Sequence, residues 1–418
     1  MIVWSIIHII DIVLWVIIAV SVFYVAFFAI ASHLPSTLHP QPSTVGEPPP
    51  VGGGRWGLPP STLNSFLVLY PAYHEDTVIR ASIETFLRQD YPRDLYQLVV
   101  ISDHMTEETN AWLASQPITL LTPTFEKSSK ARALQYAVHH AQQAMNQEPC
   151  AMNYVVILDA DNMVAPDFLS RLNATCQQGY KAIQCHRTAK NNNSDIAALD
   201  GLSEEINNSI FRRGHNRVGL SSALIGSGMC FDYVWFAENV NHLDSAVEDR
   251  ELEALLLRQG IHIHYAEDIL VMDEKVSTGD NFQRQRLRWM NGQVQALIHM
   301  SSGVPHAIAT GNINYLDKTL QQALIPRSIL LLAVPFCCII ATALHLLTPH
   351  SSPLTPLKWW LLLAALSLGL LIAIPAPLRN RALLGKVLTV AQMAWKMLKN
   401  IVHIKTTNKD FIHTTHGE

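Results

Sequence analysis

Long apolar segments at the two ends of the chain constrain its fold more than any other feature. Met1–Ala31 is almost continuously apolar, which is longer than the roughly 20 residues that a helix needs to cross a bilayer. A cleaved signal peptide has a positive start, yet the first Lys or Arg of this chain is Arg55. We therefore expect a retained membrane anchor and, near the other end, two further spans at about Ala323–Leu347 and Leu357–Ala376.

Basic residues give the three predicted spans an orientation. The loop before the third span has no Lys or Arg other than Lys358, which is at the start of that span. In contrast, seven Lys or Arg residues follow the third span, from Arg379 to Lys409. Such residues concentrate on the cytoplasmic side, and a reduced cytosolic domain on an integral protein of a bacterial-type inner membrane fits best. Its middle domain would be cytoplasmic and its N-terminus outside.

The net charge of the chain bears on its partners, and its cysteine content bears on its redox compartment. The formal charge of −4 predicts no nucleic-acid partner. The six cysteines have no paired spacing, which fits a reducing compartment for the middle domain.

Short apolar runs alternate with helical patterns in the middle of the chain. Phe66–Tyr70, Leu98–Ile101 and Tyr154–Leu158 have the character of buried strands, and Val78–Leu87 and Lys130–Ala144 have apolar residues at helical spacing. This alternation predicts an α/β domain with a mostly parallel sheet, in which ligands bind beyond the carboxyl ends of the strands.

These features divide the chain into six predicted parts. They are an anchor (1–32), a Pro/Gly-rich linker (33–62), the α/β domain (63–292), an interfacial segment (293–322), two transmembrane helices (323–377), and a cytoplasmic amphipathic helix with a tail (378–418). The last helix has Lys396, Lys399 and Trp395 among apolar residues, a pattern typical of a helix lying on a membrane surface.

Carboxylates follow two of the predicted strands. Asp159 and Asp161 come directly after one strand and would point to the same side if the chain stayed extended. Hard oxygen ligands of this kind suit Mg²⁺ or Mn²⁺ bridging a diphosphate, whereas the alternative is a turn, since Asn162 follows. Asp103 ends another strand, where its carboxylate can accept a hydrogen bond from a uracil imide or a ribose hydroxyl, or simply belong to a turn.

Glu248 and Asp249 precede a helical pattern that ends at Gly260. Ser245, three residues before Glu248, matches a capping box, so Glu248 has a purely structural explanation. The functional interpretation makes Asp249 a general base that deprotonates an acceptor hydroxyl as it attacks the anomeric carbon of a sugar, in line with a leaving diphosphate. Both interpretations can hold together.

A cationic and aromatic segment, Gln283–Trp289, has Arg at every second position. Arg forks suit diphosphate oxygens and a Trp face suits stacking on a sugar, although a membrane-surface helix also favours Arg and Trp. Lys130 can lend a cation to a nucleotide or simply solvate a helix face. The flexible backbone of Gly226–Met229 can approach an acceptor closely.

Taken together, the residues resemble those of the membrane-integrated family 2 glycosyltransferases, which include cellulose, hyaluronan and poly-N-acetylglucosamine synthases. The resemblance covers about Phe66–Trp289 and implies a Rossmann-like domain of the GT-A type. Pro71–Glu75 resembles the first nucleotide-contacting loop, and Gln285, Arg288 and Trp289 match the Gln-x-x-Arg-Trp motif. Glu248-Asp249 matches the Thr-Glu-Asp base motif, with a valine in place of its threonine.

The resemblance implies a role for each candidate residue. Asp249 would be the catalytic base, and Asp159 and Asp161 would hold the metal. The nucleotide-sugar would be bound by Pro71, Tyr73, Glu75, Asp103, Lys130, Asp159, Gln285, Arg288 and Trp289. The acceptor side would comprise Glu248, Gly226, Ser227, Gly228 and Trp289.

The implied function is inverting transfer of a sugar from a UDP-sugar to a growing glycan at the cytoplasmic face of the membrane, with Mg²⁺ or Mn²⁺ as cofactor. Three spans are few for a synthase that threads a polymer through its own channel. A homo-oligomer or an export partner that completes a channel is therefore one alternative, and single transfer to a lipid acceptor is another. An inactive nucleotide-binding subunit of an envelope complex is a third.

Overall fold

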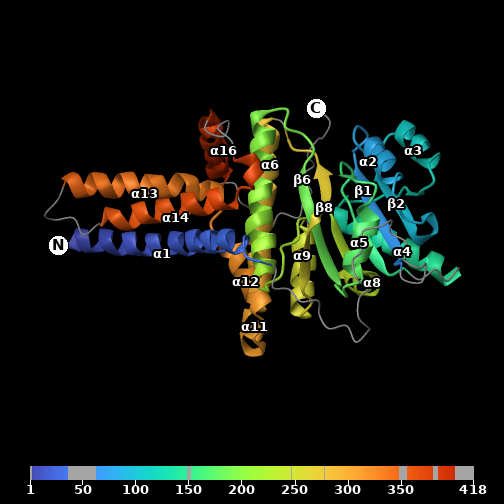
Figure 1. The fold of residues 1–418 in the computed structure, drawn as a ribbon, viewed down its shortest axis with the longest axis horizontal. Helices are drawn as coiled ribbons and strands as arrows, with labels where there is room; N and C mark the ends of the chain where they lie inside the picture. Colours follow the sequence, from blue (N-terminus) through green and yellow to red (C-terminus); the bar gives the residue numbers. More distant parts are fainter. Residues whose placement is uncertain are drawn as a thin grey trace.

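The computed structural model describes residues 2–35, 63–147, 152–245, 247–276, 278–347, 355–379 and 385–400. Most of the predicted linker, 36–62, and the predicted tail after residue 400 lie outside the described residues. Within the described part, a group of three apolar helices, a layer of helices running across their ends, and an α/β domain follow one another (Figure 1).

An eight-stranded sheet with the order β3-β2-β1-β4-β7-β6-β8-β5 forms the centre of the α/β domain. β1 is parallel to β2 and β4, β2 to β3, and β6 to β8, while β7 runs antiparallel between β4 and β6, and β5 is antiparallel to β8. The mostly parallel sheet expected from the sequence is confirmed. The strands are β1 (Phe66–Tyr73), β2 (Tyr96–Asp103), β3 (Thr119–Leu121), β4 (Tyr154–Ile157), β5 (Met163–Val164), β6 (Ala182–Ala189), β7 (Met229–Asp232) and β8 (Ile263–Asp273).

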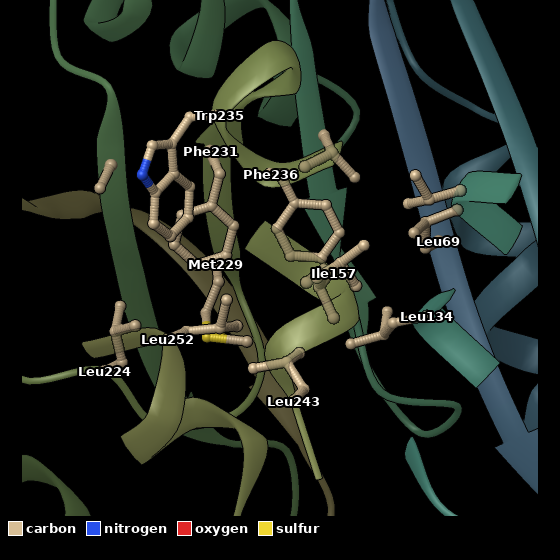
Figure 2. Packing of buried hydrophobic residues seen from close by; sticks show 14 of the residues in the cluster. Leu69, Leu134, Ile157, Leu224, Met229, Phe231, Trp235, Phe236, Leu243 and Leu252 are labelled. Atoms are coloured by element: carbon tan, nitrogen blue, oxygen red, sulfur yellow. The ribbon is translucent and has the colours of Figure 1, made fainter. Parts of the chain in front are cut away.

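Helices cover both faces of the sheet because its central strands are apolar on both faces. Along β1, Leu67 and Leu69 belong to one buried cluster, whereas Phe66 and Val68 belong to the other. Figure 2 shows residues of the first cluster, with Leu69 of β1 on one side, Met229 and Phe231 of β7 on the other, and Ile157 of β4 between them. The helices of this domain are α2 (Ile79–Phe86), α3 (Glu107–Ala114), α4 (Lys130–Gln147), α5 (Phe168–Cys176), α8 (Tyr233–Asn239) and α9 (Glu248–Arg258).

Three helices of the described part are long and apolar enough to cross a membrane, as the sequence predicts: α1 (Ile2–Ala31), α13 (Arg327–Leu347) and α14 (Pro356–Ala373). They lie side by side, with the start of α1 at the end farthest from the sheet (Figure 1). The one acidic residue of α1, Asp11, forms an ion pair with Lys358 of α14 and accepts a hydrogen bond from Trp359 Nε1 over 2.8 Å. This pairing accounts for a charged residue in an apolar segment, where an isolated charge would be costly.

A layer of helices runs across the ends of the spans (Figure 1). It consists of α6 (Asp195–Asn207), which continues through the π-helical turn η3 (Asn208–Gly214) into α7 (His215–Arg217), together with α10 (Gly279–Ser301), α11 (Val304–Thr310), α12 (Ile313–Ala323) and α16 (Val387–Asn400). α10 is continuous through residue 292, so the predicted border between the α/β domain and the interfacial segment falls inside one helix. α16, predicted to lie on the membrane surface, packs against α10 and α13, while its Trp395 is exposed.

Helix α1 directly contacts the layer of helices that runs across the ends of the spans, which we call the transverse layer. His215 stacks on Phe28 of α1, with ring centres 3.7 Å apart, and its Nε2 lies 2.8 Å from the hydroxyl of Tyr24. That hydroxyl donates to Asp317 of α12 over 2.8 Å. Gly214 makes this approach sterically feasible, because a Cβ there would overlap the carbonyl oxygen of Phe28.

We expect Gly214→Ala to weaken the contact between α1 and η3. Because the added carbon meets backbone atoms, relief requires one helix to shift, and overpacking of this kind costs about 1–3 kcal/mol. The melting temperature in detergent should fall by several degrees. Gly385→Ala is the matched control, since nothing lies within 4 Å of a Cβ at that position. Equal melting temperatures for the two variants would contradict a tight contact at Gly214.

Candidate active site

A cavity of about 540 Å³ lies at the carboxyl ends of β1, β2 and β4 and extends toward the transverse helices and the spans. Most of the site residues predicted from the sequence line it. They are Pro71, Tyr73, Glu75, Asp103, Lys130, Asp159, Asp161, Gly226, Glu248, Asp249, Gln285, Arg288 and Trp289. Residues up to 218 positions apart along the chain, from 71 to 289, therefore meet in one space.

Where β1 and β2 end, Tyr73 and Asp103 line the cavity, and two histidines, His74 and His104, lie next to them. Oδ1 of the buried Asp103 lies 2.6 Å from Nδ1 of His104, and the N–H of His74 donates to the Asp103 carbonyl over 3.3 Å. The ring of Tyr73 lies 4.5 Å from that of His74 and 5.5 Å from that of His104. Such a group can stack on and hydrogen-bond to a planar base.

His74 and His104 were not predicted as site residues. Both have a positive φ, 54° and 58°, which is costly for a residue other than glycine and tends to occur at functional sites. No local sequence pattern signals this backbone conformation, because the parallel pairing of β1 with β2 imposes it.

Lys130 is a largely buried cation that lines the cavity. Its ammonium group donates to the Asp159 carboxylate and, over 2.6 Å, to the carbonyl of Gly226, and it lies 3.5 Å from Oε1 of Glu248. Burial alone would lower the pKa of Lys130, but Asp159 and Glu248 outweigh burial and raise it above its usual value. Lys130 therefore stays charged, and it connects the start of α4 with the turn after β4, the turn at Gly226 and the start of α9.

The chain turns directly after β4, so of the two interpretations of Asp159–Asp161 the turn at Asn162 is the one observed. The N–H of Asn162 donates to the carbonyl of Asp159, and the Asn162 side chain accepts from the N–H of Asp159, each over 3.0 Å. The turn nevertheless brings both carboxylates to the cavity wall. Asp161 accepts from the N–H of Glu274 over 2.8 Å and from Asn162 Nδ2 over 3.0 Å, which orients its carboxylate.

The predicted capping box at the start of α9 is wrong. α9 begins at Glu248, and no side chain caps this end. Instead, Oε2 of Glu251 accepts from the N–H groups of Asp244 and Ser245 over 3.0 and 3.2 Å. Glu248 is thereby left to face the cavity rather than to cap the helix.

Glu248 and Asp249 lie opposite Gly226, whose φ of +84° favours glycine. A Cβ at Gly226 would lie 3.9 Å from Oε1 of Glu248 and 4.0 Å from Oδ2 of Asp249. Burial raises the pKa of Glu248 to about 7, with Lys130 opposing and Asp249 adding to the shift. Near neutral pH the pair therefore carries less negative charge than two free carboxylates.

Ser227 and Gly228 do not line the cavity, although the sequence placed them on the acceptor side. Ser227 is fully buried, and the amide of Gln184 donates to the carbonyls of Ser227 and Gly228 over 2.9 and 3.3 Å. A Cβ at Gly228 would lie 3.1 Å from the side chain of Val271. Both residues pack against β6 and β8 of the sheet, on the side of the Gly226 turn that faces away from the cavity.

Gln285, Arg288 and Trp289 reach the cavity from α10. The helix can approach the Glu248 loop because Gly292 has no side chain: a Cβ there would overlap the side chain of Val247. This contact brings one face of α10 against the residue that immediately precedes Glu248.

Arg286, which was not predicted as a site residue, is the buried arginine of this segment. Its guanidinium lies 4.1 Å from the centre of the Trp289 ring and bonds Asp200 of α6. Burial, together with the positive charges of Arg327 and Arg187, lowers the pKa of Arg286 to about 9. The alternating Arg pattern could not indicate which arginine turns inward, because that depends on the position of α6.

A buried charge cluster that the sequence analysis missed also borders the cavity. Glu204 of α6 accepts from Arg187 of β6 over 3.1 Å and from Arg212 of η3 over 3.2 Å, and Arg187 lies 3.3 Å from Asp273. Burial alone would raise the pKa of Glu204, but these cations and Lys275 lower it to about 2. These residues have no recognisable spacing and meet only because β6, β8 and α6 meet.

Comparisons with known proteins identify the family of the chain. Residues 64–292 match the family described as "Glycosyltransferase like family 2", which is more than half of the chain. The chain therefore belongs to this family, and its α/β domain is a glycosyltransferase domain of the GT-A type, as the sequence predicts.

Individual relatives are more distant. The chain is 24% identical, over 253 residues, to the probable glucomannan 4-beta-mannosyltransferase 14 of Arabidopsis thaliana; the match covers 56% of this chain and 46% of that protein. The structure is similar to that of the mannosyltransferase PcManGT from Pyrobaculum calidifontis in complex with GDP-Man and Mn²⁺, with 17% identity, a TM-score of 0.49, and 92% and 97% of the two chains covered. It is also similar to S. aureus TarS 1–349 in complex with UDP-GlcNAc, with 11% identity, a TM-score of 0.41, and 81% and 92% covered.

We expect Glu248→Gln to change how stability depends on pH. Since the pKa of Glu248 rises from 4.5 to about 7 on folding, the native state binds the proton more tightly and loses stability as the pH rises between these values. The Gln variant has no such loss. Its melting temperature relative to the wild type should therefore become more positive from pH 5 to pH 8, by about 2–4 °C for each kcal/mol involved.

Glu107→Gln, at an exposed position of α3, is the matched control for this experiment. A difference between Glu248→Gln and the wild type that stays constant from pH 5 to pH 8 would contradict a raised pKa at Glu248.

Proposed function

We propose that this chain is an inverting glycosyltransferase that moves a sugar from a UDP-sugar to an acceptor hydroxyl at the cytoplasmic face of a membrane, in the synthesis of a glycan. The observation that carries the proposal is the meeting of Asp249, Lys130, Asp159 and Trp289 in one cavity beside the ends of three apolar helices. The name of the plant relative, a glucomannan mannosyltransferase, supports a glycan product. Mannosyl donors therefore belong beside UDP-sugars in any assay.

The donor would lie with its base among Tyr73, His74 and His104. The Asp103 carboxylate would accept from a uracil imide or a ribose hydroxyl, as both are donors. Lys130 and Arg288 are the cations of the cavity best suited to the diphosphate oxygens. A neutralised diphosphate leaves more readily, because charge that develops on it is stabilised.

Asp159 and Asp161 fit a divalent metal of the hard type. Mg²⁺ usually takes one or two carboxylates from the protein and completes its shell with water and substrate phosphates. This agrees with the described residues, among which no group of three or more His, Cys, Asp or Glu side chains could hold a metal. A bound Mg²⁺ or Mn²⁺ would supply charge neutralisation for the leaving diphosphate.

Asp249 would be the general base. The acceptor oxygen forms the new bond to the anomeric carbon, the bond from that carbon to the diphosphate oxygen breaks, and the hydroxyl proton passes to the Asp249 carboxylate. A single displacement of this kind inverts the configuration at the anomeric carbon. Trp289, held by Arg286, offers a flat apolar face on which the acceptor can stack.

Asp249→Asn should lower kcat for UDP release by about 10²- to 10⁴-fold, the usual contribution of a general base. The Kd for UDP should not change, since Asp249 is placed on the acceptor side. Purified protein would be assayed with a panel of nucleotide-sugars and Mg²⁺ or Mn²⁺. Asp244→Asn, at an exposed position outside the cavity lining, is the control, and unchanged turnover in Asp249→Asn would favour an inactive subunit instead.

Chelation with EDTA should abolish turnover, and Mg²⁺ or Mn²⁺ should restore it. Asp161→Asn should raise the metal concentration needed for half-maximal turnover by at least about tenfold, since even residues that merely orient a metal ligand contribute 10–100-fold to affinity. Calorimetry of UDP binding at several metal concentrations gives a second readout. Full turnover in EDTA would contradict the role proposed for Asp159 and Asp161.

A further inference from the structure

The cavity does not end at the candidate catalytic residues but continues between the three apolar helices. Val25 of α1, Leu331 of α13 and Leu370 of α14 line it. These residues lie six, four and three positions inside the ends of their helices, at Ala31, Arg327 and Ala373. At a rise of 1.5 Å per residue, the apolar end of the cavity is roughly 5–9 Å inside the helix group.

Packed side chains close this apolar end. Val22, Leu330, Val334 and Leu366 lie next in the helix group and are fully buried in a single cluster. They fill the space between α1, α13 and α14 in the described part of the chain. The cavity therefore resembles a pocket that accepts a short apolar segment rather than the start of a channel for a polar polymer.

Two arginines, Arg286 and Arg327, lie between the apolar end and the catalytic residues, with Asp200 paired to Arg286 and Glu204 acting on Arg327 through space. The guanidinium of Arg327 donates to three neutral acceptors of α6: the carbonyl and hydroxyl of Ser203, over 3.1 and 3.3 Å, and the amide oxygen of Asn207, over 2.6 Å. Arg286 bonds one carboxylate, that of Asp200. Its buried Nε has no hydrogen-bond partner among the described residues.

The order of these features along the cavity follows from the helices that carry them. On α10, Gly292 packs on Val247 beside the catalytic pair, and Trp289 and Arg286 follow at one and two turns' distance. On α6, Asp200 bonds Arg286, and Ser203, one turn further along, bonds Arg327.

Arg327 then begins α13, and Leu331 lies one turn beyond it, inside the helix group. Along the cavity, the order is therefore the candidate base, the aromatic face of Trp289, the two arginines and the apolar pocket.

Resting on the function proposed above, we propose that the acceptor is an anionic amphiphile drawn from the bilayer. Its hydroxyl-bearing head would lie at Asp249 and Trp289, its phosphate at Arg286 and Arg327, and the start of its apolar chain among Val25, Leu331 and Leu370. Charge-assisted hydrogen bonds from an arginine fork suit a phosphate. On the side formed by α16, Met393 and Met397 line the pocket, and the flexible side chain of methionine adapts to an irregular chain.

The transfer itself is the displacement already described. The head hydroxyl of the amphiphile loses its proton to Asp249 and becomes bonded to the sugar, and the nucleoside diphosphate leaves. The product would be a glycosylated lipid that can return sideways to the bilayer, so that no channel across the membrane is needed for this step.

The test uses the full chain in vesicles of three compositions. These are phosphatidylcholine alone, phosphatidylcholine mixed with phosphatidylglycerol, and total lipid extracted from the membranes of the expressing cells. With radiolabelled nucleotide-sugars and metal, we expect label in the organic-extractable lipid of the second or third preparation and none in the first. Phosphatidylglycerol is a suitable probe because it has hydroxyls on the far side of its phosphate.

Two variants examine the pocket itself. Leu331→Trp should fill the apolar end and lower lipid labelling at least about tenfold, the equivalent of about 1.4 kcal/mol, without changing the Kd for UDP. Ile339→Trp is its control, because Ile339 is on the same helix but does not line the cavity. Arg327→Gln should raise KM for the anionic lipid by about 10- to 100-fold, and Arg327→Lys should recover part of this loss.

The outcomes separate the two proposals. Label found only in a water-soluble glycan, or donor consumed equally in all three preparations with no labelled lipid, would overturn the amphiphile and leave the transferase intact. An equal loss in Leu331→Trp and Ile339→Trp would likewise overturn the pocket. No donor consumption in any preparation would overturn the proposed function, and this inference with it.

Discussion

The buried ammonium group of Lys130 is the interaction on which the rest of the site depends. Burying a lone cation is expensive, and here the Asp159 carboxylate, the Gly226 carbonyl and the Glu248 carboxylate compensate for it. These three groups come from the turn after β4, from the turn before β7 and from the start of α9. The charge of Lys130, the first residue of α4, thus contacts the ends of three separate elements and holds them close together around the cavity.

A second constraint comes from the three long apolar helices. α1 is held on the transverse layer by the stacking of His215 on Phe28 and by the hydrogen bonds of Tyr24. Arg327, at the start of α13, donates to Ser203 and Asn207 of α6. Because the three apolar helices are tied to the helices that form the cavity wall, the candidate catalytic residues and the apolar pocket are parts of one space. A soluble domain with the same sheet would have the part of the cavity at the strand ends but not the apolar pocket.

Much of the fold was predictable because it rests on local periodicity. The spans followed from the length of apolar segments, and β1, β2 and β4 followed from apolar runs that end in polar residues. The errors arose where neighbouring elements decide the local geometry. Glu251 rather than a capping box supports the start of α9, and Ser227 and Gly228 are enclosed by the sheet. The turn at Asp159, in contrast, is closed locally by Asn162, as one of the two sequence-based interpretations had it.

The sequence by itself determined the family, the three apolar helices, the α/β sheet and the carboxylates at its strand ends, because each depends on residue type and spacing within one segment. Only the tertiary structure decided that Arg286 turns inward onto Asp200, 86 residues away, and that Gly292 packs on Val247. It alone also decided that the cavity continues into the helix group. Contacts between distant segments depend on how whole helices pack, and packing is a property of the assembled chain that no local pattern contains.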